Sequence, residues 1–351
     1  MTLIQGPKMG LSGRYNFTVQ HPDTRKTITG RDGMPVYRDG SGFVRRAGVW
    51  HPNLITDRGL DQFQNELWLD PDGIRDYVKV GTGTATPDVT DATLAAYHGE
   101  STSTGPGNDA YLASYNTDAA PEYHFKGTKV GVFTASGAVT LTEFGFDAAS
   151  GDNASVRELL RDGAGDPTTV ALTNGQTISV QHEAFLYMPE ETTVAFDVVE
   201  KNLAGTTVAT ESYTGVIYAV YGIATYGSTF GYLEPSSAKF ADDLYFQSVG
   251  FTKPAGIGTG THINQSAAND LAGNPTLLAY TAGDHYVDIR MSLDSTDQLP
   301  SDADVKAILT GYISVNDLDV GYALLLDDTQ SIPKANTHSL TLTMRMAWGR
   351  A

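Results

Sequence analysis

The sequence predicts a mainly-β protein: a β-sandwich of antiparallel strands with one or two short helices and long polar loops. The 351 residues include 37 Gly, 15 Pro and 18 Tyr, a composition typical of short strands joined by many turns. Polar and apolar residues alternate over 14–20 and again over 339–350, which is the period of a half-buried strand. Asn174-Gly175 separates two further alternating runs and predicts a hairpin.

The N-terminal quarter combines two strand candidates, a loop and a helix. Residues 14–20 predict a strand, residues 21–42 a long polar loop or arm, and residues 42–50 a second strand that its double arginine weakens. Asp57 is the predicted N-cap of a helix. The apolar positions of that helix follow a three-and-four spacing, and a turn sequence ends it: Leu60, Phe63, Leu67 and Trp68, then Pro71, Asp72 and Gly73.

The middle of the chain predicts strands and one hairpin. Residues 139–146 predict a strand with a bulge at 143–145. The strand after Asn174-Gly175 carries one apolar face, made of Ile178, Val180, His182, Ala184, Leu186 and Met188. Residues 192–227 predict two or three strands with a turn near 202–205.

Towards the C-terminus the sequence predicts a strand at 284–293 and, at best, a short helix at 302–312. Residues 339–350 close the chain with a strand that we expect to lie in the main sheet beside strands made much earlier. One face of this strand is apolar: Leu340, Leu342, Met344, Met346 and Trp348. For the domains we expect N-terminal strands at 1–52 and a main sandwich at 53–351 with insertions at 99–121 and 250–283.

Charge and composition narrow the classes of function. The net charge of −18 repels nucleic acids and anionic membranes, so we expect no nucleic-acid partner. The chain has no cysteine, which excludes disulfides and thiolate metal sites. The N-terminus lacks the layout of a secretory signal, and no run of about 18 apolar residues is present. We therefore expect synthesis in a cytoplasm and no membrane insertion.

A strand at 77–80 runs into Gly81-Thr82-Gly83, a pattern that raises the question of a phosphate-binding loop. Such a loop needs a lysine after its last glycine, or a third glycine at a fixed spacing. Here Thr84, Ala85 and Thr86 follow instead. We therefore interpret the glycines as a strand-exit turn, followed by a short helix capped near Thr90.

Residues suited to catalysis or metal binding are scattered. No His-x-His pair occurs, and His182 alternates with apolar residues like a core or interface histidine. The Asp-rich turns at 151–153, 242–243 and 327–328 lack a full set of calcium ligands. Ser228 narrowly misses the Gly-x-Ser-x-Gly pattern of hydrolases, and the adjacent carboxylates at 190–191 point to opposite faces of a strand. We predict no enzyme, no cofactor and no catalytic residue.

Aromatic residues gather among glycines at 213–232. Exposed rings next to Asp and Asn suit the stacking of sugars, and the alternative is that these rings cover sheet faces and subunit contacts. The candidate residues for glycan or subunit contact are Tyr213, Tyr218, Tyr221, Tyr226 and Tyr232.

Two segments resemble virion structural proteins of tailed bacteriophages. The first reads Asn-Leu-Ile-Thr-Asp-x-Gly-Leu over 53–60. The second reads Val-Gly-Thr-Gly-Thr-x-x-Pro-x-x-x-Asp-x-x-Leu over 80–94. The Thr-Glu-x-Gly-Phe stretch in 141–147, the segment 157–189 and the closing strand are similar to the same group. These are turn-and-strand signatures, and the resemblance covers about 10–190 and the last dozen residues.

The resemblance implies a virion protein of the tail, baseplate or fibre-attachment region that assembles as a homo-oligomer with other virion proteins. A capsid decoration or head–tail collar protein, or a receptor-binding fibre module that contacts a host glycan, remains an alternative. Residues 1–50, locally basic at Arg45-Arg46, are either an arm that reaches a neighbouring subunit or two edge strands packed within the chain.

Overall fold

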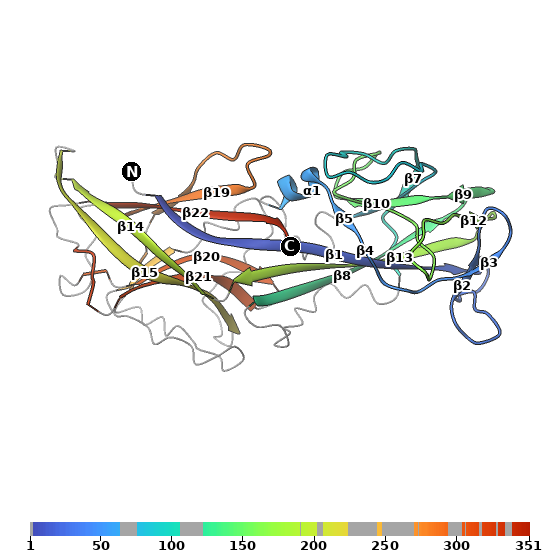
Figure 1. The fold of residues 1–351 in the computed structure, drawn as a ribbon, viewed down its shortest axis with the longest axis horizontal. Coiled ribbons are helices and arrows are strands. Elements are labelled where there is room, and N and C mark those ends of the chain that lie inside the picture. The colour runs from blue at the N-terminus through green and yellow to red at the C-terminus, as the bar shows by residue number, and fades with distance from the viewer. Residues whose placement is uncertain are drawn as a thin grey trace. The chain divides into compact units, whose positions relative to one another are not determined.

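The computed structural model describes most of the chain, and its β-strands dominate Figure 1. The described residues form two compact units. Unit 1 comprises Met1–Met9, Asn116–Tyr123 and Tyr187–Gly349, and unit 2 comprises Gly10–Tyr115, His124–Leu186 and Arg350–Ala351. The described residues are 3–63, 76–105, 122–189, 191–201, 206–223, 244–247, 270–272, 274–293, 304–305, 307–315, 318–327, 329–333 and 339–351.

The predicted N-terminal strand lies in a seven-stranded sheet. This strand is β1 (Leu3–Gln20), and it is followed in the sheet by β13 (Thr177–Pro189) and β8 (Glu122–Thr134), with β4 (His51–Pro52) also paired to β1. The alternation in the sequence is confirmed by the buried side chains Tyr15, Phe17, Val19, Ile178, Val180, His182, Ala184 and Leu186, whereas the side chain of Met188 lies outside the described residues. Alternate residues point to one face because the strand period is two.

The second sheet of unit 2 has the order β5-β11-β10-β6-β7. Aromatic contacts join it to the first sheet: Tyr15 lies 4.4 Å from Phe144 and His182 lies 5.3 Å from Phe146, between ring centroids. Two antiparallel sheets face to face make a sandwich, so the predicted fold class is confirmed. The strands are β5 (Leu54–Ile55), β11 (Val156–Leu159), β10 (Glu143–Asp147), β6 (Tyr77–Gly81) and β7 (Tyr97–Ser101).

The predicted strand at 139–146 is two strands. It divides at Thr142 into β9 (Val139–Leu141), which pairs with β12 (Val170–Leu172), and β10, which pairs with β6 and β11. The bulge predicted at 143–145 is wrong, because the register there is regular. The register shift lies instead between Val80 and Gly81, where β6 pairs with β7.

The turn at Asn174-Gly175 is present, but its two flanking strands belong to different sheets. β12 pairs with β9, whereas β13 lies in the sheet of β1 and β8. Gly175 has φ +80° and Asn174 is not among the residues with positive φ. A tight hairpin needs positive φ at both central residues (type I′) or at the first (type II′), and turns of types I and II splay the strands apart. The predicted hairpin is therefore wrong as a strand pairing.

Residues 21–50 contain a small sheet where the sequence predicts a loop and then a strand. β2 (Val36–Arg38) falls inside the predicted loop at 21–42, and β3 (Val44–Arg46) is the short core of the predicted strand at 42–50. The two strands pair antiparallel. Residues 10–52 lie in unit 2 with residues 53–105, and β1 is an interior strand between β22 and β13. A subunit contact by residues 1–52 stays a prediction.

In unit 1, one sheet has the order β14-β15-β21-β20-β16-β17. The two or three strands predicted at 192–227 correspond to β14 and β15, which pair antiparallel, and the turn predicted near 202–205 lies outside the described residues. The short helix predicted at 302–312 is wrong. Residues 307–312 belong to strand β20, which forms backbone hydrogen bonds with β16 on one side and β21 on the other. The strands are β14 (Glu191–Lys201), β15 (Thr207–Ile223), β21 (Leu318–Leu326), β20 (Ala307–Val315), β16 (Leu244–Gln247) and β17 (Asp270–Ala272).

The predicted closing strand is β22 (Leu340–Arg350), and it lies in the same seven-stranded sheet as β1, β13 and β8. β22 pairs with β19 (Tyr286–Leu293) and lies next to β1, and β18 (Asn274–Leu277) pairs with the far edge of β19. The strand predicted at 284–293 is confirmed as β19. The position of β22 beside β1, a strand from the start of the chain, is also as predicted. The predicted apolar face is buried in full: Leu340, Leu342, Met344, Met346 and Trp348.

Candidate functional site

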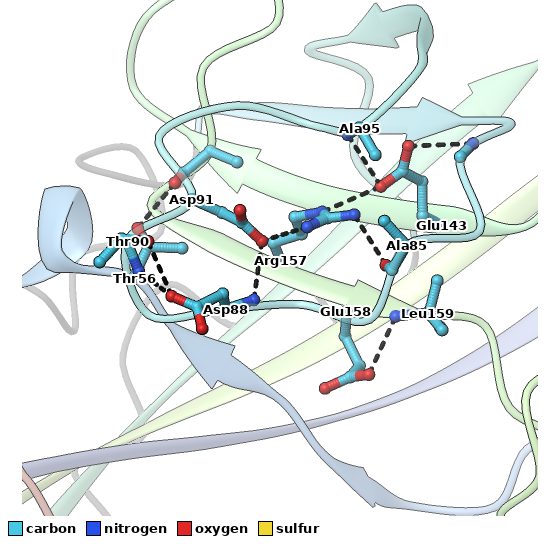
Figure 2. A network of polar contacts seen from close by, with 12 residues as sticks. Thr56, Ala85, Asp88, Thr90, Asp91, Ala95, Glu143, Arg157, Glu158 and Leu159 are labelled. Atoms are coloured by element: carbon cyan, nitrogen blue, oxygen red, sulfur yellow. Dashed lines mark hydrogen bonds and ion pairs between the residues drawn. The ribbon is translucent and has the colours of Figure 1, made fainter.

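The glycine stretch after β6 surrounds an acidic side chain of the same chain (Figure 2). The carboxylate of Glu143, from β10, accepts hydrogen bonds from the backbone N–H groups of Gly83 (3.1 Å), Ala95 (3.2 Å) and Ala96 (2.8 Å). Backbone N–H groups that converge on one point form an anion site. Here the anion is the carboxylate of Glu143, which is fully buried.

Gly81 and Gly83 are required by close approach. A Cβ atom on Gly81 would lie 2.6 Å from Oε1 of Glu143 and 2.7 Å from the carbonyl oxygen of Ala96. A Cβ atom on Gly83 would lie 2.6 Å from Cβ of Ala95. Neither glycine has a positive φ. The glycines therefore let the loop close around Glu143, which is a geometric role of the kind predicted from the sequence.

Arg157, from β11, ties this loop to the sheet. Its guanidinium donates to Oε2 of Glu143 (3.0 Å), to the carbonyl oxygen of Ala85 (3.0 Å) and to the carboxylate of Asp91. Arg157 is buried, and its charge is compensated by one buried and one partly exposed carboxylate. A buried charge is tolerated when it is paired and its N–H groups are bonded. Figure 2 shows Arg157 between the two acidic side chains.

The segment around Thr90 is a turn, so the short helix predicted there is wrong. Oδ1 of Asp88 accepts from the backbone N–H (3.0 Å) and the hydroxyl (2.7 Å) of Thr90, and these bonds lower the pKa of Asp88. The backbone N–H of Asp88 in turn donates to Asp91 (2.7 Å). Asp and Thr side chains that bond to the nearby backbone compete with helix formation.

The segment 53–60 enters the same sheet through Thr56. Its hydroxyl donates to the carbonyl oxygen of Ala154 (2.8 Å) and accepts from the backbone N–H of Gly59 (3.2 Å). Thr56 is therefore the N-cap of α1 (Asp57–Gln62), and the predicted cap Asp57 is the first helical residue. Thr56 is extended, with φ −78° and ψ 168°, as a cap must be. Leu60 and Phe63 are buried as predicted, whereas Leu67, Trp68 and the predicted stop lie outside the described residues.

A second buried carboxylate, Asp147 at the end of β10, holds α1 against the sheet. It accepts from Arg58 (2.8 Å and 3.0 Å), from the hydroxyl of Ser155 (2.7 Å) and from the backbone N–H of Ala149 (2.8 Å). Burial acts to raise the pKa of Asp147, but these hydrogen bonds outweigh it and the pKa lies below its ordinary 3.8. The stabilisation is complete above that ordinary value and is lost as the pH falls through the lower pKa of the folded protein.

The sequence marks Glu143 only as a strand irregularity and assigns no role to Arg157. The signal that was available is a charged residue inside each of two apolar strands, since Glu143 precedes Phe144 and Arg157 follows Val156. Charges of opposite sign in neighbouring buried strands pair when the register places them side by side. The register pairs Glu143 with Leu159 and Gly145 with Arg157, so the two charges are diagonal neighbours on one face.

The tyrosines predicted for glycan or subunit contact are only partly described. Tyr213 is buried, its ring stacks 5.9 Å from that of Phe196, and its hydroxyl donates to Glu211 (2.7 Å). This placement fits the alternative in which the rings cover a sheet face. Tyr218 and Tyr221 lie in β15, and their side chains are outside the described residues, as are Tyr226 and Tyr232 entirely. Glycan contact by these residues stays a prediction.

The described residues bear on the metal and membrane expectations as well. In these ranges no group of three or more acidic or histidine side chains is placed to hold a metal ion. His182 is buried against Phe146, the packing predicted for a core histidine. Asp242 and Asp243 and also Asp328 lie outside the described residues. No helix in the described part of the chain has the length and apolar character needed to cross a bilayer.

Comparison of the chain with protein-family models, with curated proteins and with solved structures finds no match. The site must therefore be interpreted from its own geometry. The capping hydroxyl of Thr56 bonds to the connection between β10 and β11, while the backbone N–H groups of the glycine stretch and Arg157 bond to Glu143. These contacts fix three segments of the chain to one sheet.

Proposed function

We propose that this chain is a structural component of a tailed-bacteriophage virion, in the tail, baseplate or fibre-attachment region, and that it works as a homo-oligomer. The proposal starts from the resemblance of residues 53–60, 80–94 and 141–147 to virion structural proteins. It also uses the mainly-β fold, because rigid sheets with connecting loops suit a protein that makes repeated subunit contacts.

One observation carries the proposal: the segments that bear the resemblance are joined to one another in a single network. Arg58, from the first segment, donates to Asp147 of the third (2.8 Å), and Gly83, from the second, donates to Glu143 of the third. Arg157 adds Asp91 and Ala85 of the second segment. The shared residues therefore act as a scaffold, which supports a mechanical role for the chain.

The composition supports the same role. A virion protein has to persist outside a cell without repair, and a chain without cysteine has no thiol to oxidise. The net charge of −18 keeps the surface from binding packaged nucleic acid by electrostatic attraction. These are general physical requirements, and they agree with the proposal.

The test is to locate the protein in purified particles. Virions from an infected culture are purified on a density gradient, analysed by mass spectrometry, and labelled with a gold-conjugated antibody against this chain for electron microscopy. We expect the chain in the particle fraction and label at the tail, with an abundant host cytoplasmic protein as the negative control. Label on the head or collar would overturn the tail assignment. Absence of the chain from the particles would overturn the virion role.

A further inference from the structure

The exposed apolar side chains of unit 2 gather in one small region. Met34, Phe43, Val44 and Val49 are 46%, 66%, 57% and 39% exposed, and in the described residues the only other large apolar side chain this exposed is Tyr97, at 40%. We call residues 34–49, which include β2 and β3, the exposed hairpin. Apolar side chains that cluster at the surface indicate a binding site, because soluble proteins rarely expose contiguous apolar patches.

The exposed hairpin is fixed by a buried side chain on its inward face and by hydrogen bonds at its tip. Tyr37 is buried, its ring packs 5.1 Å from that of Phe17, and its hydroxyl donates to Thr168 (2.8 Å). At the tip, the buried carboxylate of Asp39 accepts from the backbone N–H groups of Ser41 and Phe43, at 2.9 Å each. A surface fixed before binding loses little conformational entropy when a partner arrives.

The outward face of the exposed hairpin combines apolar and cationic side chains. Cross-strand partners share a face of the sheet, and the register pairs Arg38 with Val44 and Val36 with Arg46. Residues 34–49 contain three Arg but one Asp, whereas the rest of the chain contains 20 Lys and Arg but 40 Asp and Glu. The hairpin region is therefore basic on an otherwise acidic chain.

We infer that the exposed hairpin docks on an acidic face of a second copy of this chain. Every copy carries the basic, apolar exposed hairpin and is acidic over the rest of the chain. The hairpin of one copy is therefore complementary in charge to the acidic surface of another copy. Because the two surfaces differ, the contact is heterologous and joins copies head to tail, in a ring if the rotation closes. The inference rests on the proposed homo-oligomer and specifies which surface makes it.

A nucleic acid fits the exposed hairpin less well than a protein. Asp32 and Asp39 lie among its basic residues and form ion pairs with Arg46 (3.0 Å) and Arg45 (2.9 Å). Phosphate backbones are bound by rows of free Lys and Arg, whereas apolar side chains at the centre of a patch with arginines around them are typical of protein interfaces.

The first test compares Phe43→Ser with Tyr97→Ser in the purified full-length chain. Both change an exposed aromatic residue of unit 2, but only Phe43 belongs to the exposed hairpin. Sedimentation velocity over a range of protein concentrations measures the association of copies. We expect Phe43→Ser to weaken association at least about tenfold, since burial of such a side chain contributes that much or more, and Tyr97→Ser to leave it unchanged. The melting temperatures of both variants should match the unchanged protein.

The second test addresses charge and identifies the partner. Arg38→Glu and Lys8→Glu change the net charge equally at two exposed positions, and only the first should weaken association. Lys26 is the one lysine of residues 21–50, so a carbodiimide can link its amine to a carboxylate. In a mixture of ¹⁴N- and ¹⁵N-labelled chains, we expect mixed-isotope links between Lys26 and an Asp or Glu of another copy.

Three outcomes overturn the inference. A chain that stays monomeric at all concentrations has no such contact. An oligomer that is equally stable after Phe43→Ser uses another surface. If the chain binds DNA or lipopolysaccharide through the exposed hairpin and does not self-associate, the hairpin serves a different class of partner. These results are independent of the virion test, because the chain can be found in particles whether or not this hairpin joins its copies.

Discussion

Replacing Glu143 with alanine is the sharpest test of the network at the glycine stretch. The change removes the carboxylate that accepts from Arg157, Gly83, Ala95 and Ala96. Arg157 then keeps only Asp91 as a charged partner, and that carboxylate is partly exposed. The variant therefore leaves a buried guanidinium half-compensated and the loop without its central anchor.

The expected loss is dominated by the broken ion pair. Removing one partner of a buried pair costs about 3–5 kcal/mol, because the remaining charge stays buried. Of the three backbone N–H groups, those of Ala95 and Ala96 belong to exposed residues where water can replace the carboxylate, whereas Gly83 is buried. We expect Glu143→Ala to lower the free energy of unfolding of unit 2 by about 3–5 kcal/mol, a large share of the roughly 5–15 kcal/mol of a typical domain.

The assay must report on unit 2, since a chain of two compact units need not unfold in one step. Native-state hydrogen exchange with mass spectrometry over β6, β10 and β11 measures the local free energy of opening. The matched control is Asp32→Ala, which breaks an exposed ion pair with Arg46 and should cost about 1 kcal/mol or less. Glu143→Met combined with Arg157→Met should recover much of the loss, because neither charge of this ion pair then remains buried without its partner.

A Glu143→Ala variant that loses no more than Asp32→Ala would refute the anchoring role of Glu143 in the glycine stretch. The same holds if the double methionine variant is less stable than Glu143→Ala alone. In either case the buried pair would not be what fixes the loop to the sheet.

Three further predictions test other parts of the structure. Gly83→Ala should destabilise unit 2 by about 1–3 kcal/mol, since its Cβ atom has no room, while Gly137→Ala, where nothing lies within 4 Å, should be neutral; thermal unfolding compares the two. Leu342→Asp should abolish soluble expression because it buries a charge in β22, whereas Thr341→Asp, at an exposed position of the same strand, should stay soluble; equal solubility would contradict the burial of this face. Arg58→Ala should move the midpoint of acid unfolding to higher pH, because its buried aspartate partner then has a higher pKa in the folded protein; circular dichroism against pH measures the shift, and an unchanged midpoint would contradict it.

The sequence alone was sufficient for the strands whose burial alternates. In residues 14–20 of β1 and 340–348 of β22 every second side chain is apolar, and a strand places alternate side chains on opposite faces whatever its neighbours are. The sequence also predicts strands at 192–227, and the antiparallel pairing of β14 with β15 is what the structure adds. The geometric role of the glycines at 81 and 83 was also predictable, because the next residues, 84–86, lack the lysine or third glycine of a phosphate loop.

Only the tertiary structure decided which strands meet, and that choice also made the site. Residues 139–147 look like one strand, yet they change sheets at Thr142, and the turn at Asn174-Gly175 joins strands that do not pair with each other. Arg157 meets Glu143 and Asp91 only because β11 lies beside β10 and the loop folds over both. Such pairings depend on residues far apart in the chain, whose packing and hydrogen bonds no local pattern records.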